Sequence, residues 1–206
     1  MNKQREMNYF QYGDIELRHL KEKDPILGEQ IEKLGMLYRQ INEDIFSELI
    51  FSIISQQIST KAALTVKDRL ISLIGDISPE NIHKTSVEDI QSCGMSMRKA
   101  EYIKGIGEAA INKSIDFDNL KNLSDEEVIK ELTKLKGVGG WTVEMLLIHS
   151  LKRPDVVSYK DLAIRKGMMK LYGLDDLSKE EFNLYRKSYS PHGTVASIYI
   201  WEISLK

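Results

Sequence analysis

The stretch LKGVGGWT at residues 135–142 decides the fold, because it joins two helical patterns through a turn built from glycines. Apolar residues at three- and four-residue spacing precede it over 125–135, and an apolar run follows it from about residue 140. Gly137 and Gly139 allow the chain to reverse tightly with positive backbone φ, while Val138 can enter the core between the helices. The stretch therefore predicts a helix-hairpin-helix.

The second helix of this hairpin should begin at Gly139 or Gly140, where backbone amides without helical partners face outward. These amides and the positive end of the helix dipole form a site for a phosphate group, and such contacts read no base sequence. The alternative is that these glycines form only a helix end and a turn, which is the commoner meaning of Gly-x-Gly after a helix. The candidate phosphate-binding residues are Gly137, Gly139, Lys136, Thr142 and Lys61.

The rest of the chain also reads as helical, because it has four prolines and no alternating Val/Ile/Thr runs. We expect helices near 25–35, 45–56, 60–74, 86–92, 97–113, 125–135, 140–151, 161–172, 179–188 and 193–204. Three capping boxes support several of these starts, at Thr85-x-x-Glu88, Ser124-x-x-Glu127 and Ser178-x-x-Glu181.

The helix expected over 45–55 is apolar nearly all round and should run through the core of one half, and a second apolar helix at 143–151 should be the spine of the other half. They predict an all-α fold of two helical lobes with a groove between them. We expect an N-terminal helical segment (1–44) packed on the C-terminal lobe, a first lobe (45–115), and a lobe that carries the hairpin (116–206).

Composition excludes several classes of protein. The single cysteine, Cys93, allows no intramolecular disulfide and no iron–sulfur site that needs several thiolates. No apolar run is long enough to span a membrane, so we expect a soluble, cytoplasmic protein, associated with the nucleoid if bacterial. The net charge is −2, yet residues 130–170 hold nine basic and four acidic side chains. A basic surface on an acidic body is typical of nucleic-acid binding.

A resemblance to a known family rests on three separated stretches. The run at 135–167, the segment ISQQISTKAA at 54–63 and the end of the chain at 196–201 resemble the helix-hairpin-helix-GPD superfamily of DNA glycosylases. In that superfamily a loop after the hairpin leads to an essential aspartate, which the resemblance places at Asp161. It also implies that Gln57 is a wedge that enters the DNA stack, with Gln56 and Ile58 beside it. The alternative is that the two glutamines only cap helix ends.

The resemblance also separates branches of the superfamily. Iron–sulfur members carry four cysteines after the aspartate, and this chain has none there. Bifunctional members carry a Schiff-base lysine two residues after the second hairpin glycine, where this chain has Trp141. Trp141, Trp201 and the QQIS segment resemble the compact 3-methyladenine DNA glycosylase II type, which is monofunctional. The resemblance implies a base pocket of Trp141, Trp201, Met145 and Tyr159.

The chemistry of that branch suits a single carboxylate. An alkylated purine is a cation whose bond to the sugar is already weakened, so the enzyme must stabilise an oxocarbenium-like sugar and activate water. Asp161, at the start of the helix expected over 161–172, is the candidate, and the helix dipole there favours its ionised form. The alternative is that Asp161 is only a helix cap.

The expected partner is double-stranded DNA that contains damaged bases. We expect a monomer with no membrane association and no cofactor or metal, apart from a possible cation held by the hairpin carbonyls when DNA binds. Three other functions stay open: a non-catalytic helix-hairpin-helix DNA-binding module, a helical protein–protein module, and an oxidised-base glycosylase, which Trp141 in place of lysine opposes.

Overall fold

A computed structural model describes residues 8–206, and this part of the chain is all-α, as predicted. Besides the helices it contains one isolated antiparallel bridge, between Tyr9 and Gln40. The helices are α1 (Asp14–Lys23), α2 (Pro25–Leu34), α3 (Ile45–Ser55), α4 (Thr60–Ile74), α5 (Pro79–Lys84), α6 (Val87–Ser92), α7 (Met97–Ile111), α8 (Asp125–Leu132), α9 (Gly140–His149), α10 (Leu162–Tyr172), α11 (Lys179–Tyr189) and α12 (Gly193–Leu205), with a 3-10 turn η1 (Leu120–Asn122).

Side-chain caps set most of the helix starts. The capping boxes at Ser124 and Ser178 are confirmed, because each serine accepts a bond from the amide of the glutamate three residues on. The box predicted at Thr85 is wrong. Thr85 ends α5, and Ser86 instead caps α6 by accepting from the amide of Asp89.

Three helices differ clearly from the sequence expectation. α5 was not expected, although Ser78 caps it and Pro79 is its first residue. α1 was not expected, since its start at Gly13 has no side-chain oxygen to mark it, although Glu16 accepts from the Gly13 amide. α8 ends at Leu132, three residues earlier than expected, so the turn of the hairpin is longer than the glycines alone indicate.

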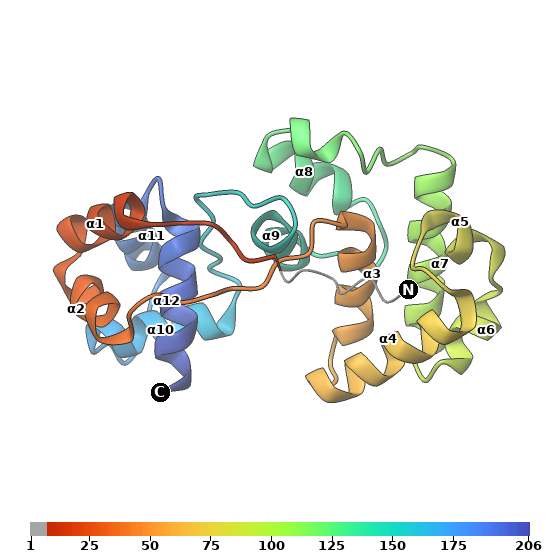
Figure 1. The fold of residues 1–206 in the computed structure, drawn as a ribbon, viewed down its shortest axis with the longest axis horizontal. Helices are drawn as coiled ribbons and strands as arrows, with labels where there is room; N and C mark the ends of the chain where they lie inside the picture. Colours follow the sequence, from red (N-terminus) through yellow and green to blue (C-terminus); the bar gives the residue numbers. More distant parts are fainter. Residues whose placement is uncertain (1–7) are drawn as a thin grey trace. The chain divides into compact units, whose positions relative to one another are not determined.

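The chain forms two compact units. Unit 1 joins the described residues up to Ile41 with Leu147–Lys206 (Figure 1). Its centre is α12, which packs against α10, α2 and α11. Gly167 lets α10 approach α12 closely, since a Cβ there would lie 2.2 Å from the carbonyl oxygen of Ile200.

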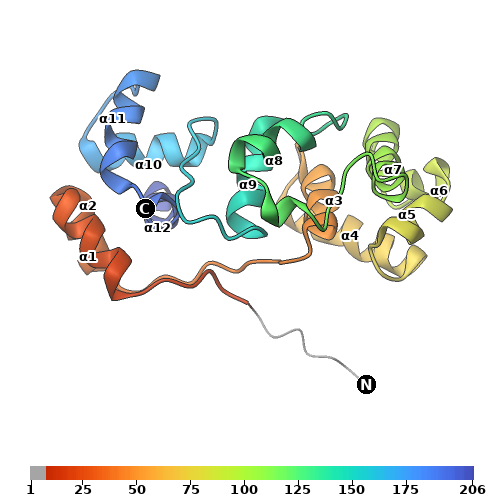
Figure 2. The same cartoon turned by 90° about the horizontal axis from the view of Figure 1, so that it is seen from above.

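Unit 2 comprises Asn42–Leu146 and is built on the buried helix α3, which packs against α4 and α7. The short helices α5 and α6 pack on α7 (Figure 2). The expected boundary at residue 115 does not divide the contacts of the chain, because the hairpin segment belongs to this unit. Phe117 packs edge-on against Phe46 of α3, and Tyr102 of α7 lies against Gly137.

No helix among residues 8–206 is both long enough and apolar enough to cross a lipid bilayer.

Candidate functional site

The hairpin predicted at 135–142 is present, between α8 and α9. Val138 is 6% exposed, so its side chain is buried, as expected. Gly137 has φ +84, and a Cβ there would lie 2.2 Å from the Tyr102 ring. Gly139 has no positive φ, and a Cβ there would meet nothing within 4 Å. The two glycines therefore serve different ends: Gly137 closes the turn, while Gly139 leaves the outer surface of the turn open.

The surface of the hairpin offers a basic side chain beside the open backbone. Lys136 and Gly139 are exposed, and α9 begins at Gly140. Thr142 is 4% exposed, so its side chain faces inward and not toward a phosphate on the outer surface. Lys61, in the first turn of α4, is exposed.

Residues 55–58 form a type II turn at the end of α3. Gln56 has φ −56 and ψ 126, and Gln57 has φ 61, close to the angles of about (−60, +120) and +80 that define this turn. The amide of Ile58 donates to the carbonyl of Ser55 at 3.4 Å and closes it. The second central position of a type II turn favours glycine, so a glutamine there is strained. Gln57 is exposed at this strained position, which is consistent with a wedge.

Gln56 connects this turn to the hairpin. Its Nε2 donates to the carbonyl oxygen of Gly137 at 3.0 Å, across 81 positions of sequence. The side chain of Gln56 is therefore a structural link, and the carbonyl of Gly137, one of those expected to hold a cation, already accepts a bond. Ile58, on the other side of Gln57, is 41% exposed.

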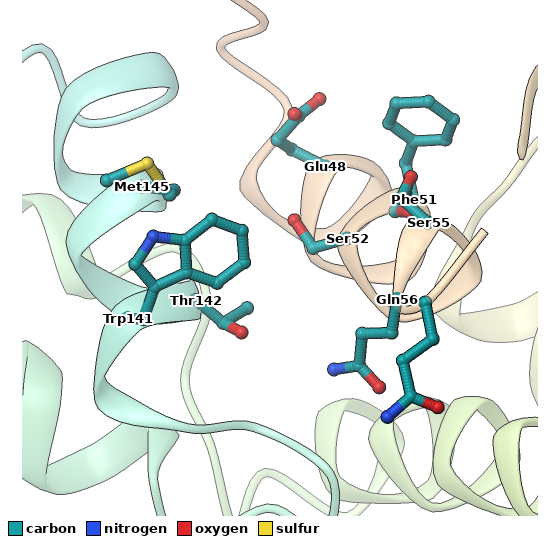
Figure 3. A pocket seen from close by; sticks show the side chains of 9 residues that line it. Glu48, Phe51, Ser52, Ser55, Gln56, Trp141, Thr142 and Met145 are labelled. Atoms are coloured by element: carbon teal, nitrogen blue, oxygen red, sulfur yellow. Dashed lines mark hydrogen bonds between the residues drawn. The ribbon is translucent and has the colours of Figure 1, made fainter. Parts of the chain in front are cut away.

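A cavity of about 430 Å³ lies between α3 and α9 within unit 2 (Figure 3). This volume is in the range of small-molecule sites, roughly 300–1,000 Å³. Trp141 and Met145 form one wall from α9, and the indole ring of Trp141 is turned toward α3. The nine lining residues are Glu48, Phe51, Ser52, Ser55, Gln56, Gln57, Trp141, Thr142 and Met145.

Asp161 caps α10 in unit 1. Its Oδ1 accepts a bond from the amide of Ile164 at 2.9 Å and a second from Nε1 of Trp201 at 3.3 Å. The side chain is held at the positive end of the helix dipole, where a negative charge is favoured, and is 7% exposed. Asp161 therefore caps α10 and also receives a hydrogen bond from a residue 40 positions away.

Two basic side chains surround Trp201. The guanidinium of Arg39 lies 4.6 Å from the centre of the indole ring, and the ring of His149 stacks at 5.8 Å with an interplanar angle of 18°. Burial, with the charge of Arg39, lowers the pKa of His149 to about 4. Burial also lowers the pKa of Arg39, while the carboxylates of Glu202 and Asp161 oppose this shift. At neutral pH Arg39 is therefore the cation of this cluster and His149 is neutral.

Arg39 and His149 were not predicted from the sequence. Arg39 lies in an extended segment, where its carbonyl accepts from the amide of Phe10, and no motif marks it. His149 is the last residue of α9, eight positions after Trp141, and only the prediction of that helix could have drawn attention to it.

The predicted residues thus gather in two groups. The cavity of unit 2 is lined by one group, which consists of Trp141, Met145, Thr142, Gln56 and Gln57. The other group is in unit 1, where Trp201 is hydrogen-bonded to Asp161. Tyr159, also in unit 1, packs edge-on against Phe182 and has the guanidinium of Arg165 5.3 Å from its ring centre. Its contacts are those of a residue at the edge of a core.

Across residues 8–206, no three His, Cys, Asp or Glu side chains are grouped so that they could hold a metal ion. Cys93 is buried, and burial raises the pKa of its thiol.

Comparison with known proteins gives concordant similarities. Residues 50–191 match the HhH-GPD superfamily of base excision DNA repair proteins. The chain is 38% identical to DNA-3-methyladenine glycosylase 1 of Schizosaccharomyces pombe over 164 residues, which cover 77% of this chain and 72% of the relative. It is 36% identical to a DNA-3-methyladenine glycosylase of Saccharomyces cerevisiae over 208 residues, which cover 90% of this chain and 68% of the relative.

Solved structures agree. A DNA-3-methyladenine glycosidase from Bacillus halodurans superposes with a TM-score of 0.86 at 34% identity, over 96% of this chain and 93% of that one. A 3-methyladenine DNA glycosylase of Schizosaccharomyces pombe in complex with abasic DNA gives a TM-score of 0.80 at 34% identity, over 92% of this chain and 96% of that one.

Proposed function

Because the chain belongs to the HhH-GPD superfamily of base excision DNA repair proteins, we propose that it is a DNA glycosylase that excises alkylated purines and leaves an abasic site. The similarity to DNA-3-methyladenine glycosylases of two yeasts supports this substrate class. The observation that carries the proposal is the buried carboxylate of Asp161, held by the start of α10 and by the indole N–H of Trp201. Its partner is damaged double-stranded DNA, on which it acts as a monomer without a resident cofactor.

The reaction needs a flipped base, because the bond to the sugar is inaccessible inside the duplex. The hairpin backbone at Gly139 and the side chain of Lys136 hold phosphates, and Gln57 fills the space that the base leaves. The extruded base enters the cavity of unit 2. There the face of Trp141 attracts a cationic purine by about 0.5–2 kcal/mol, which favours alkylated over normal bases.

Asp161 acts on the sugar. A protonation step is not needed, since a positively charged purine leaves as a neutral molecule. The carboxylate stabilises the positive charge that develops on the sugar and orients the water that attacks it. Trp141 stands where a lyase would need an amine, so no Schiff base forms and the strand stays intact.

The test compares two buried aspartates that each cap a helix. Asp24 caps α2, accepts from the amide of Leu27 at 2.9 Å and is 7% exposed, as Asp161 is. We expect Asp161→Asn to lower single-turnover excision from methylated duplex DNA at least 100-fold, roughly the loss of one key charge in an active site. The Asp24→Asn variant, as the control, should excise bases from the same DNA at close to the wild-type rate. Equal rates for Asp161→Asn and the wild type would contradict the assignment.

A further inference from the structure

The end of α3 depends on a lysine from another helix. Lys99, in the first turn of α7, donates from Nζ to the carbonyl oxygens of Ile54, at 2.8 Å, and of Gln56. The neighbouring carbonyls have backbone partners, because the amide of Gln56 donates to Ile53 and that of Ile58 to Ser55. Lys99 therefore completes the hydrogen bonding of a helix end whose last carbonyls would otherwise lack donors.

One of its two bonds controls the shape of the turn. The carbonyl of Gln56 belongs to the peptide between Gln56 and Gln57, which is the central peptide of the type II turn. Type I and type II turns differ by a rotation of this peptide through roughly half a turn. In the type I form the second central residue would have a negative φ of about −90, which a glutamine adopts without strain. A donor fixed on the Gln56 carbonyl therefore opposes the flip that would relieve Gln57.

The environment of the ammonium group supports this role. Lys99 is partly buried, and burial lowers the pKa of its side chain. A cation at the end of a helix is also favoured by the negative end of its dipole. On the other side of the turn, Gln56 Nε2 is bonded to Gly137, so the turn is held from both the α7 and the hairpin sides.

We propose that Lys99 is a positioning residue that holds the 56–57 peptide in its type II orientation and so aims Gln57 into the DNA stack. The proposal rests on the wedge role of Gln57 in the function proposed above. Without the Lys99 bonds the peptide flips, Gln57 relaxes to a negative φ, and its side chain leaves the direction needed for insertion.

The chain contains a matched control. Lys104, one helical turn and a half further along α7, is also partly buried and also donates from Nζ to two carbonyls, those of His83 and Thr85 at the end of α5. It makes the same kind of contact, but with a helix end that has no part in the turn. Lys99→Met and Lys104→Met remove the same chemistry at two places.

The experiment measures wedge insertion and catalysis together. Each variant is mixed with a duplex that carries 2-aminopurine beside a tetrahydrofuran abasic site, and fluorescence reports unstacking. Excision from methylated DNA gives kcat and KM, and thermal melting gives stability. We expect Lys99→Met to lose most of the fluorescence change and to lower kcat/KM by roughly tenfold or more, the size of one charged hydrogen bond. Lys99→Arg, which keeps the donors, should restore both.

Lys104→Met should keep the fluorescence change and kcat/KM of the wild type, even if both Met variants melt at lower temperatures. Wild-type fluorescence and kcat/KM in Lys99→Met would overturn the proposal. An equal loss in Lys104→Met would overturn it too, because it would show a general effect on folding. A wild type that neither excises nor changes the fluorescence would instead overturn the proposed function, and with it the role of Lys99.

Discussion

At the scale of single residues, Trp201 has contacts that the resemblance did not predict. The resemblance implies that it lines the base pocket, which stays a prediction, and in the structure its indole N–H donates to Asp161 while its ring lies beside Arg39 and His149. The bond joins residues 40 positions apart, so no local pattern could have predicted it. Trp201 thus has the contacts of a residue that orients the carboxylate.

Trp201→Phe separates the two roles, because it keeps an aromatic ring and removes the donor. If the N–H orients Asp161, we expect kcat to fall by roughly tenfold with little change in KM, since a hydrogen bond to a charged group is worth about 1.5–3 kcal/mol. Steady-state excision kinetics check this. A higher KM with unchanged kcat would show that the ring binds the base instead.

His149 makes folding stability depend on pH. Its pKa is about 4 in the folded protein because of burial and the nearby Arg39, against about 6.5 in an unfolded chain. Between these values the unfolded state binds more protons, so stability is lost as pH falls from about 6.5 to about 4, by up to about 3 kcal/mol. Urea unfolding at pH 7 and at pH 4.5 measures this loss, and we expect the free energy of unfolding of His149→Gln to fall less between the two pH values than that of the wild type. Identical pH dependence in the two proteins would contradict this.

At the scale of elements, much of the fold followed from the sequence, because helix starts have local causes. Ser124 and Ser178 cap their helices where the boxes predicted. The capping box predicted at Thr85 was wrong because the neighbouring Ser86 is an equally good cap, and a pattern of four residues cannot distinguish between two adjacent capping residues. The type II turn at Gln57 was also missed, since its strained residue is not the glycine that signals such turns.

The hairpin gives a prediction about its two glycines. Gly137→Ala must place a side chain at φ +84 and against the Tyr102 ring, so we expect a loss of about 2 kcal/mol or more in the free energy of unfolding. Gly139→Ala meets open space and should unfold almost as the wild type does. Denaturant unfolding of both variants checks the contrast. Equal stabilities would show that the turn does not depend on the conformation of Gly137.

At the scale of the whole molecule, the parts of the proposed activity are divided between the two units. Unit 2 holds the hairpin, the turn of Gln57 and the cavity, and unit 1 holds Asp161 and Trp201. The expected boundary at residue 115 missed this division, because the contacts that draw the hairpin to α3, such as Gln56 to Gly137, span 81 positions. The near-neutral net charge of −2 likewise hides the nine basic side chains between residues 130 and 170.

The central claim is that this chain hydrolyses the bond between an alkylated purine and its sugar. Its most direct test is chromatography of the bases that the wild-type protein releases from methylated duplex DNA, with the strands examined on a gel before any heat or alkali. We predict release of 3-methyladenine or 7-methylguanine with intact strands. Failure to release any alkylated base, or prompt strand cleavage, would contradict the account.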